Sequence, residues 1–194
     1  SGAEVVAAIV AGYEVCCRLG MALDPTAHYA RGFHPTATAG TFGAAAAAAR
    51  LYGLDAEGIA RAFGVSGSQA AGSLQFLVNG AWNKRYQVGE AAMKGLMAAT
   101  LAAEGFQGAK EALEGRHGLL KGYSDDASAE RATAGLGTVW ETMRIGVKPY
   151  PACRYTHAAV DGLLQLRQAH GWAADDIARC RLIVLQLEVP LETV

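Results

Sequence analysis

The sequence has 194 residues, and its 17 Lys and Arg nearly balance its 18 Asp and Glu, for a formal net charge of −1. Hydrophobic residues make up 52% of the chain, which is enough for a substantial core in one large domain. Neither sign of charge dominates, and this argues against the basic surface that a nucleic-acid partner requires.

The cysteines and the opening residues indicate the compartment. Cys16, Cys17, Cys153 and Cys180 form neither a CxxC pair nor a cluster with histidine, so we expect no metal site. We expect buried thiols in a reducing, cytoplasmic environment. Residues 1–4 lack the features of a signal peptide, and the apolar run after them is too short for a membrane span, so we expect no membrane partner.

The first predicted element is a helix that starts at residue 1. Ser1 and Glu4 have the spacing of a capping box, in which each side chain binds the other's backbone N–H. We expect the helix to reach about Leu19. A turn is predicted at residues 24–25, and a loop at residues 29–36, where aromatic and charged residues mix with Gly and Pro.

A second helix is predicted over residues 36–51, with Pro35 suited to its first turn. Its six consecutive alanines, residues 44–49, are strong helix formers. Their small side chains also allow neighbouring helices to approach closely. Two shorter helices are predicted after it, over residues 56–63 and 65–72.

The next stretch alternates loops and helices. Residues 79–80 are Asn-Gly and predict a turn, and residues 82–88 predict an aromatic and basic loop. Helical spacing returns over residues 90–103. Further short helices are expected at residues 109–113, near Leu119, at residues 127–134 and at residues 139–143.

The pattern then changes. Two prolines within residues 148–151 favour an extended segment. Residues 155–168 have helical spacing, and residues 177–189 partly alternate apolar with polar residues, which predicts a strand. The sequence therefore predicts a mainly α protein, with a helical domain over residues 1–143 and the start of an α+β domain over residues 144–194.

Polar residues in two predicted loops are candidates for chemistry. His34 precedes a helix N-terminus, where it could act as an acid or base beside a bound anion. The alternative is a loop histidine that binds a backbone carbonyl. Lys84 and Arg85 lie beside aromatic residues and could hold a carboxylate. The alternative for them is a basic surface turn.

A third candidate segment, residues 147–157, lies at the predicted domain junction, where ligand sites are common. The alternative is a structural linker whose prolines fix its geometry. The glycine-rich nucleotide motifs, the GxSxG motif and the HExxH motif do not occur in the sequence. The functional side chains of the third segment are Lys148, Cys153, Arg154, Tyr155 and His157.

In this order the three segments resemble signatures of the MmgE/PrpD family, and residues 1–15 and 176–179 resemble it as well. The resemblance implies a larger, typically dimeric protein, in which an α+β lid is inserted into an all-helical domain. It places the active site in the cleft between helical domain and lid, without a metal or organic cofactor. This chain would then be a central fragment that lacks the family's N-terminal helices, an upstream active-site histidine, the rest of the lid and the C-terminal helices.

The resemblance also assigns roles. His34, Lys84 and Lys148 match the positions of family active-site residues, and Cys153 stands where some members have histidine. Around Lys84, family members often have His and Pro where this chain has residues 87–88, Gln and Val. The residues expected to bind substrate are Arg85, Cys153, Arg154, Tyr155 and His157.

These observations predict a cofactor-independent lyase or isomerase, similar to 2-methylcitrate dehydratase, that acts on a small di- or tricarboxylate. Lys84 and Lys148 would hold carboxylates, while His34 moves a proton at the carbon beside one of them. Dehydration, decarboxylation and epimerisation all fit the sequence. The alternative is a non-catalytic or truncated remnant that serves as a binding or assembly module. A homodimer is expected.

Overall fold

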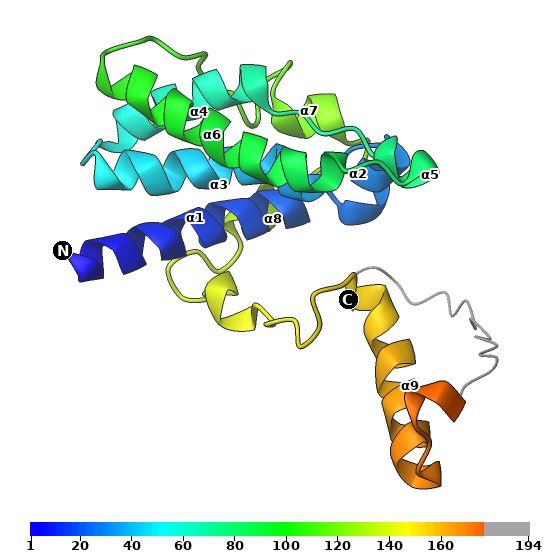
Figure 1. Ribbon diagram of the computed structural model, residues 1–194. Coiled ribbons are helices and arrows are strands. Elements are labelled where there is room, and N and C mark those ends of the chain that lie inside the picture. The colour runs from blue at the N-terminus through cyan, green and yellow to red at the C-terminus, as the bar shows by residue number, and fades with distance from the viewer. Residues whose placement is uncertain (177–194) are drawn as a thin grey trace. The chain divides into compact units, whose positions relative to one another are not determined.

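The structure, a computed structural model, describes residues 1–176 (Figure 1). The chain divides into two compact units, Ser1–Arg144 and Ile145–Val194. The described residues of both units form helices and no strand, apart from an isolated antiparallel bridge between Phe33 and Ser73. The mainly α prediction is confirmed. The strand predicted over residues 177–189 lies outside the described residues.

The first helix, α1, covers Gly2–Ala22 and begins with the predicted capping box. The Ser1 hydroxyl accepts from the backbone N–H of Glu4, and the Glu4 carboxylate binds the amino group of Ser1. Helix α1 is long and apolar enough to cross a membrane. Core helices of soluble proteins and signal sequences meet the same criterion. In this fold α1 packs along α3, the helix Pro35–Leu51.

Helix α3 is the centre of the first unit, with α1 on one side and α6 (Asn83–Ala103) on another (Figure 1). These helices meet through glycines. A Cβ added to Gly43 would lie 2.7 Å from the carbonyl oxygen of Gly12 in α1, and one added to Gly95 of α6 would lie 2.6 Å from the carbonyl oxygen of Thr41. The close packing predicted from the small residues of α3 is therefore confirmed.

Two apolar clusters form the core of this unit. One is centred on Leu23 and Phe42, both fully buried, and includes residues of α7, the helix Leu119–Tyr123. The other joins α3 and α6 to α4, the helix Ala56–Gln69. These contacts hold in place the loops that precede α3 and α6, where His34 and Lys84 were predicted to act.

Several predicted boundaries are wrong for identifiable reasons. Helix α4 is continuous where two helices were predicted, because Gly64 does not end the helix. Gly64 instead allows another segment to pack closely, since a Cβ added there would lie 2.3 Å from the backbone nitrogen of Ala109. The loop predicted at residues 82–88 is the first turns of α6. Residues 109–113 form turns. Two helices were missed, α2 (Pro25–Ala30) and α5 (Phe76–Asn79).

Hydrogen bonds from side chains of α1 hold the end of the first unit in place. Helix α8, Ala129–Thr133, and the 3₁₀ helix η1, Glu141–Arg144, occupy segments where helices were predicted. The buried Arg18 donates to the carbonyl oxygens of residues 132, 134 and 139, and the buried Glu14 accepts from the N–H and hydroxyl of Thr142. An Arg18–Glu14 ion pair of 3.1 Å joins these two groups.

The described part of the second unit is mostly one helix, α9, over His157–His170. The short 3₁₀ helix η2, Arg154–Thr156, leads into it, and Gly171 ends it in the left-handed conformation. A further 3₁₀ turn, η3, covers Ala174–Asp176. The helix predicted at residues 155–168 is confirmed.

Candidate active site

His34 is the residue immediately before α3, and its backbone is extended. Its N–H donates to the carbonyl oxygen of Gly72 at 2.8 Å, while the N–H of Leu74 donates to the carbonyl oxygen of Gly32 at the same distance. These bonds flank the Phe33–Ser73 bridge. The loop before α3 is thus tied to the loop after α4, and this fixes the base of the His34 side chain.

The imidazole of His34 is almost buried, with 5% of the residue exposed. Its Nδ1 lies 2.9 Å from Oε1 of Gln87 in α6. The amide nitrogen of Gln87 in turn donates to the carbonyl oxygen of Ser73 at 2.8 Å. The ring also makes an edge-to-face contact with Phe76, with the two centroids 5.9 Å apart.

The second ring nitrogen of His34, Nε2, has a different environment. Within residues 1–176 it has no hydrogen-bond partner, and it is not one of the fully buried polar atoms that lack a partner. With 5% of the residue exposed, Nε2 has at most a narrow contact with solvent. A histidine with one nitrogen fixed and the other open has the arrangement of a general acid or base.

Lys84 and Arg85 lie in the first turn of α6, so they belong to a helix and not to the predicted basic turn. Lys84 is one turn before Gln87 and therefore on the same helix face. Both cations are exposed, and the Arg85 guanidinium carbon lies 5.3 Å from the centre of the Trp82 ring, a cation–π contact. Lys84 is thus on the face of α6 that carries Gln87, the hydrogen-bond partner of His34.

The electrostatics of this cluster favour a neutral imidazole. Burial lowers the pKa of His34 below its ordinary value, the hydrogen bond to Gln87 acts in the opposite direction, and the charge of Lys84 lowers the pKa further. At neutral pH His34 is therefore ready to accept a proton. Exposed Lys84 beside it offers a positive charge to a carboxylate.

Sequence reasoning missed two residues of this region, Gln87 and His28. His28 of α2 is fully buried, with Nδ1 2.9 Å from the carbonyl oxygen of Tyr123 and Nε2 2.9 Å from the hydroxyl of Thr38. Burial lowers the pKa of His28. Gln87 had a usable signal, since it follows Lys84 by three residues, but only once the segment is known to be helical.

The remaining predicted residues belong to the second unit. Lys148, Cys153, Arg154 and Tyr155 are exposed in it. His157 is fully buried at the start of α9, with Nε2 3.3 Å from the carbonyl oxygen of Ala152 and Nδ1 without a partner in the described part of the chain. The roles predicted for these five residues, and their convergence with His34 and Lys84, stay predictions.

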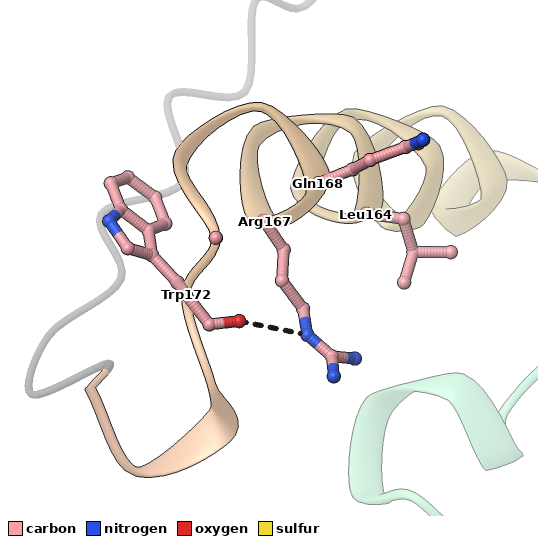
Figure 2. Close-up of a pocket in the computed structure, with 5 residues that line it drawn as sticks. Leu164, Arg167, Gln168 and Trp172 are labelled. Carbon is pink, nitrogen blue, oxygen red and sulfur yellow. Dashed lines mark hydrogen bonds between the residues drawn. The ribbon is translucent and has the colours of Figure 1, made fainter.

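A pocket of about 450 Å³ lies at the end of α9 (Figure 2). Figure 2 shows Arg167 facing the backbone of Trp172, and its Nε donates to the Trp172 carbonyl oxygen at 3.1 Å. No predicted site residue lines this pocket. Within residues 1–176 there is also no group of three or more His, Cys, Asp and Glu that could hold a metal ion.

Comparison with known proteins identifies similar chains. Residues 1–132 match a family model described as the MmgE/PrpD N-terminal domain. A cis-aconitate decarboxylase-like protein of Aspergillus oryzae is 30% identical over 98% of this chain, which covers 41% of that protein. Cis-aconitate decarboxylases of Aspergillus terreus and Homo sapiens are 33% and 29% identical over 86% and 87% of this chain, which covers 35% of each. The chain thus spans about two fifths or less of the length of these curated relatives.

Proposed function

Because this chain belongs to the MmgE/PrpD family, we propose that the intact protein is a lyase that acts on a small tricarboxylic acid. The relatives carry the name of cis-aconitate decarboxylase, so cis-aconitate is one candidate substrate. Citrate and 2-methylcitrate are the others, because they present the same arrangement of carboxylates around a short carbon chain. A homodimer in the cytoplasm remains the expected setting.

The single observation that carries the proposal is the His34–Gln87–Lys84 cluster. Nε2 of the neutral His34 imidazole has no hydrogen-bond partner within residues 1–176, and the positive charge of Lys84 is close enough to lower the pKa of that imidazole. A carboxylate held by Lys84 would therefore place its neighbouring carbon near a base. This is the pairing that proton transfer beside a carboxylate requires.

We propose the following roles. Lys84 binds a substrate carboxylate, and Nε2 of His34 takes the proton from the adjacent carbon. Negative charge then moves onto the carboxylate as an enolate-like state, which the ammonium group stabilises more strongly than it does the ground state. In a dehydration the hydroxyl on the next carbon takes the proton from the His34 imidazolium and leaves as water, which restores the neutral base. This would be the course of a 2-methylcitrate dehydratase.

The test is to incubate the intact protein with citrate, 2-methylcitrate and cis-aconitate in deuterated water and to follow each acid by NMR. Dehydration of citrate produces an alkene proton, dehydration of 2-methylcitrate moves its methyl group onto a double bond, decarboxylation releases carbon dioxide, and reversible proton abstraction replaces hydrogen by deuterium beside a carboxylate. We expect at least one of these signals. We also expect the rate to survive dialysis against EDTA, because the scheme uses no metal.

Two results would contradict the proposal in different ways. Absence of turnover and of exchange with all three acids would exclude the lyase assignment, and binding without turnover would favour the non-catalytic alternative. Loss of the rate on treatment with EDTA, with recovery on adding a metal ion, would show that the roles given to His34 and Lys84 are incomplete.

A further inference from the structure

We propose that Gln87 is a positioning residue for His34, holding the imidazole proton on Nδ1 so that the Nε2 lone pair faces the substrate. This inference rests on the proposed function, because it assigns Gln87 a task only if His34 is the base. It concerns a position where the chain departs from the residues that the MmgE/PrpD resemblance leads one to expect.

The first step is the orientation of the Gln87 amide. Its nitrogen lies 2.8 Å from the carbonyl oxygen of Ser73, which can only accept a hydrogen bond. Turning the amide over would place two oxygens against each other. The Ser73 carbonyl therefore fixes the amide nitrogen on its own side and directs Oε1 toward His34.

The second step is the tautomer of His34. Oε1 of Gln87 is an acceptor and lies 2.9 Å from Nδ1, so Nδ1 must carry the hydrogen. A neutral imidazole has one N–H, which leaves Nε2 with the lone pair. Free histidine in water prefers the opposite tautomer, with the proton on Nε2. The contact with Gln87 thus selects the form that can accept a proton at the open nitrogen.

The third step is the rigidity of the contact. Gln87 is 6% exposed, and His34 is fixed through its own backbone bond to Gly72. Gly72 has φ +153°, and an added Cβ would lie 2.5 Å from Cβ of Ala37 in α3. The strand-like bridge therefore lies tightly against α3, and the amide and imidazole have little freedom to separate.

The charge of a neighbouring residue also acts on the His34 imidazole. Lys84 on α6 and His28 on α2 are the titratable groups coupled to His34 in the described residues. Lys84 disfavours a second proton on the ring, whereas the amide of Gln87 is uncharged. Gln87 thus directs the base without converting it into a permanent imidazolium, as a carboxylate at the same position would tend to do.

The experiment is an NMR measurement of the imidazole nitrogens of His34 in the intact wild-type protein, at a pH where the ring is neutral. We expect the proton on Nδ1 and an unprotonated Nε2. A His34 signal with the proton on Nε2 overturns the proposal, and this measurement needs no variant. Gln87→Leu removes the acceptor and is expected to move the proton to Nε2, wholly or in part. A Gln87→Leu protein that keeps it on Nδ1 also overturns the proposal.

Kinetics on the substrate found in the NMR panel provide the second readout. Gln87→Leu should lower kcat by at least about tenfold with KM little changed, because a base in the wrong tautomer still allows binding. Gln87→Glu keeps an acceptor for Nδ1–H but raises the pKa of the imidazole, so it should shift the acid limb of the rate profile to higher pH and restore much of kcat only above that limb. If Gln87→Glu is as slow as Gln87→Leu, or leaves the limb unmoved, Gln87 does not act through His34.

Gln75→Leu is the matched control. Gln75 is exposed, precedes α5 and makes no capping hydrogen bond with its side chain, so the same substitution there should change neither tautomer nor kcat. The two claims fail separately. Absence of turnover with every acid refutes the proposed function, while the NMR signal of wild-type His34 still decides whether Gln87 holds its proton.

Discussion

Lys84 and Arg85 are adjacent cations with different neighbours, and this difference can be measured. The charge of Lys84 lowers the pKa of His34, whereas the guanidinium of Arg85 lies over Trp82. Removing the Lys84 charge should therefore raise the pKa of His34. We predict that Lys84→Met moves the acid limb of kcat/KM to higher pH and weakens binding of the tricarboxylate.

Arg85→Met removes the same charge one residue along the helix and serves as the control. We expect it to leave the acid limb in place. Equal movement of the limb in both variants would mean that general surface charge, and not the proximity of Lys84, sets the titration of His34.

His28 couples the fold to pH. Since burial lowers the pKa of His28 in the folded state, the stability it contributes is present above its ordinary pKa of about 6.5 and is lost as pH falls. We predict that the free energy of unfolding in urea decreases from pH 7.5 to pH 5, and that His28→Gln makes this decrease shallower.

The exposed His117 provides the comparison for His28. His117→Gln makes the same substitution at the surface and controls for the loss of a histidine as such. An equally shallow slope in the two variants, or no change in His28→Gln, would show that His28 is not responsible.

At the scale of single residues, a sequence shows which side chains can take part in chemistry more readily than it shows which side chains are buried. His34 and Lys84 are recognisable because imidazole and ammonium groups beside glycine, proline and aromatic residues are typical of sites. Gln87 is not, because an amide becomes informative only when its two partners, Ser73 and His34, are known. Those partners lie in other segments of the chain, so the residues around Gln87 in the sequence do not indicate them.

Among the elements, the contact between α6 and α3 leaves no room for a single added methyl group at Gly95. A Cβ at Gly95 would meet backbone atoms of Thr41 and Ala45 at 2.6 Å, and backbone cannot move aside as a side chain can. We predict that Gly95→Ala destabilises the fold by about 1–3 kcal/mol in denaturant unfolding.

Gly89 lies on the same helix, is exposed and has nothing within 4 Å of its Cβ position. Gly89→Ala should therefore stabilise the helix by about 0.5–1 kcal/mol, the usual advantage of alanine over glycine. If both substitutions change stability in the same direction, close packing against α3 is not what excludes a side chain at Gly95.

Element boundaries were predictable where a cap is visible. The capping box of Ser1 and Glu4 marks the start of α1, and Asp55 accepts from the N–H of Gly58 at the start of α4. The start of α6 was missed because its N-cap, Trp82, provides no side-chain hydrogen bond. The start of α2 has a visible cap, since Asp24 caps a helix that begins with Pro25, but an Asp-Pro pair is equally typical of a turn.

For the molecule as a whole, the exposed apolar residues of α1 raise the question of assembly. Val5, Val6, Ile9 and Tyr13 are each about half exposed on the first part of this helix. Apolar surface of this kind favours association. We predict that residues 1–194 expressed alone form dimers or larger aggregates in sedimentation velocity, and a monomer that melts cooperatively would contradict this.

The mainly α class and the family followed from the whole sequence, because helical periodicity and an ordered set of motifs extend along most of the chain. The strand predicted for the α+β lid lies outside the described residues. The relation of Lys148 to His34 likewise stays a prediction, because it links two units that are described separately.

The most direct test of the account compares the wild-type protein with His34→Gln on the tricarboxylate identified by NMR. If Nε2 of His34 is the base, kcat should fall by on the order of a hundredfold or more, the acid limb of the pH–rate profile should disappear, and the dissociation constant should change little. A variant that retains more than about a tenth of the wild-type kcat with the limb intact would contradict the account.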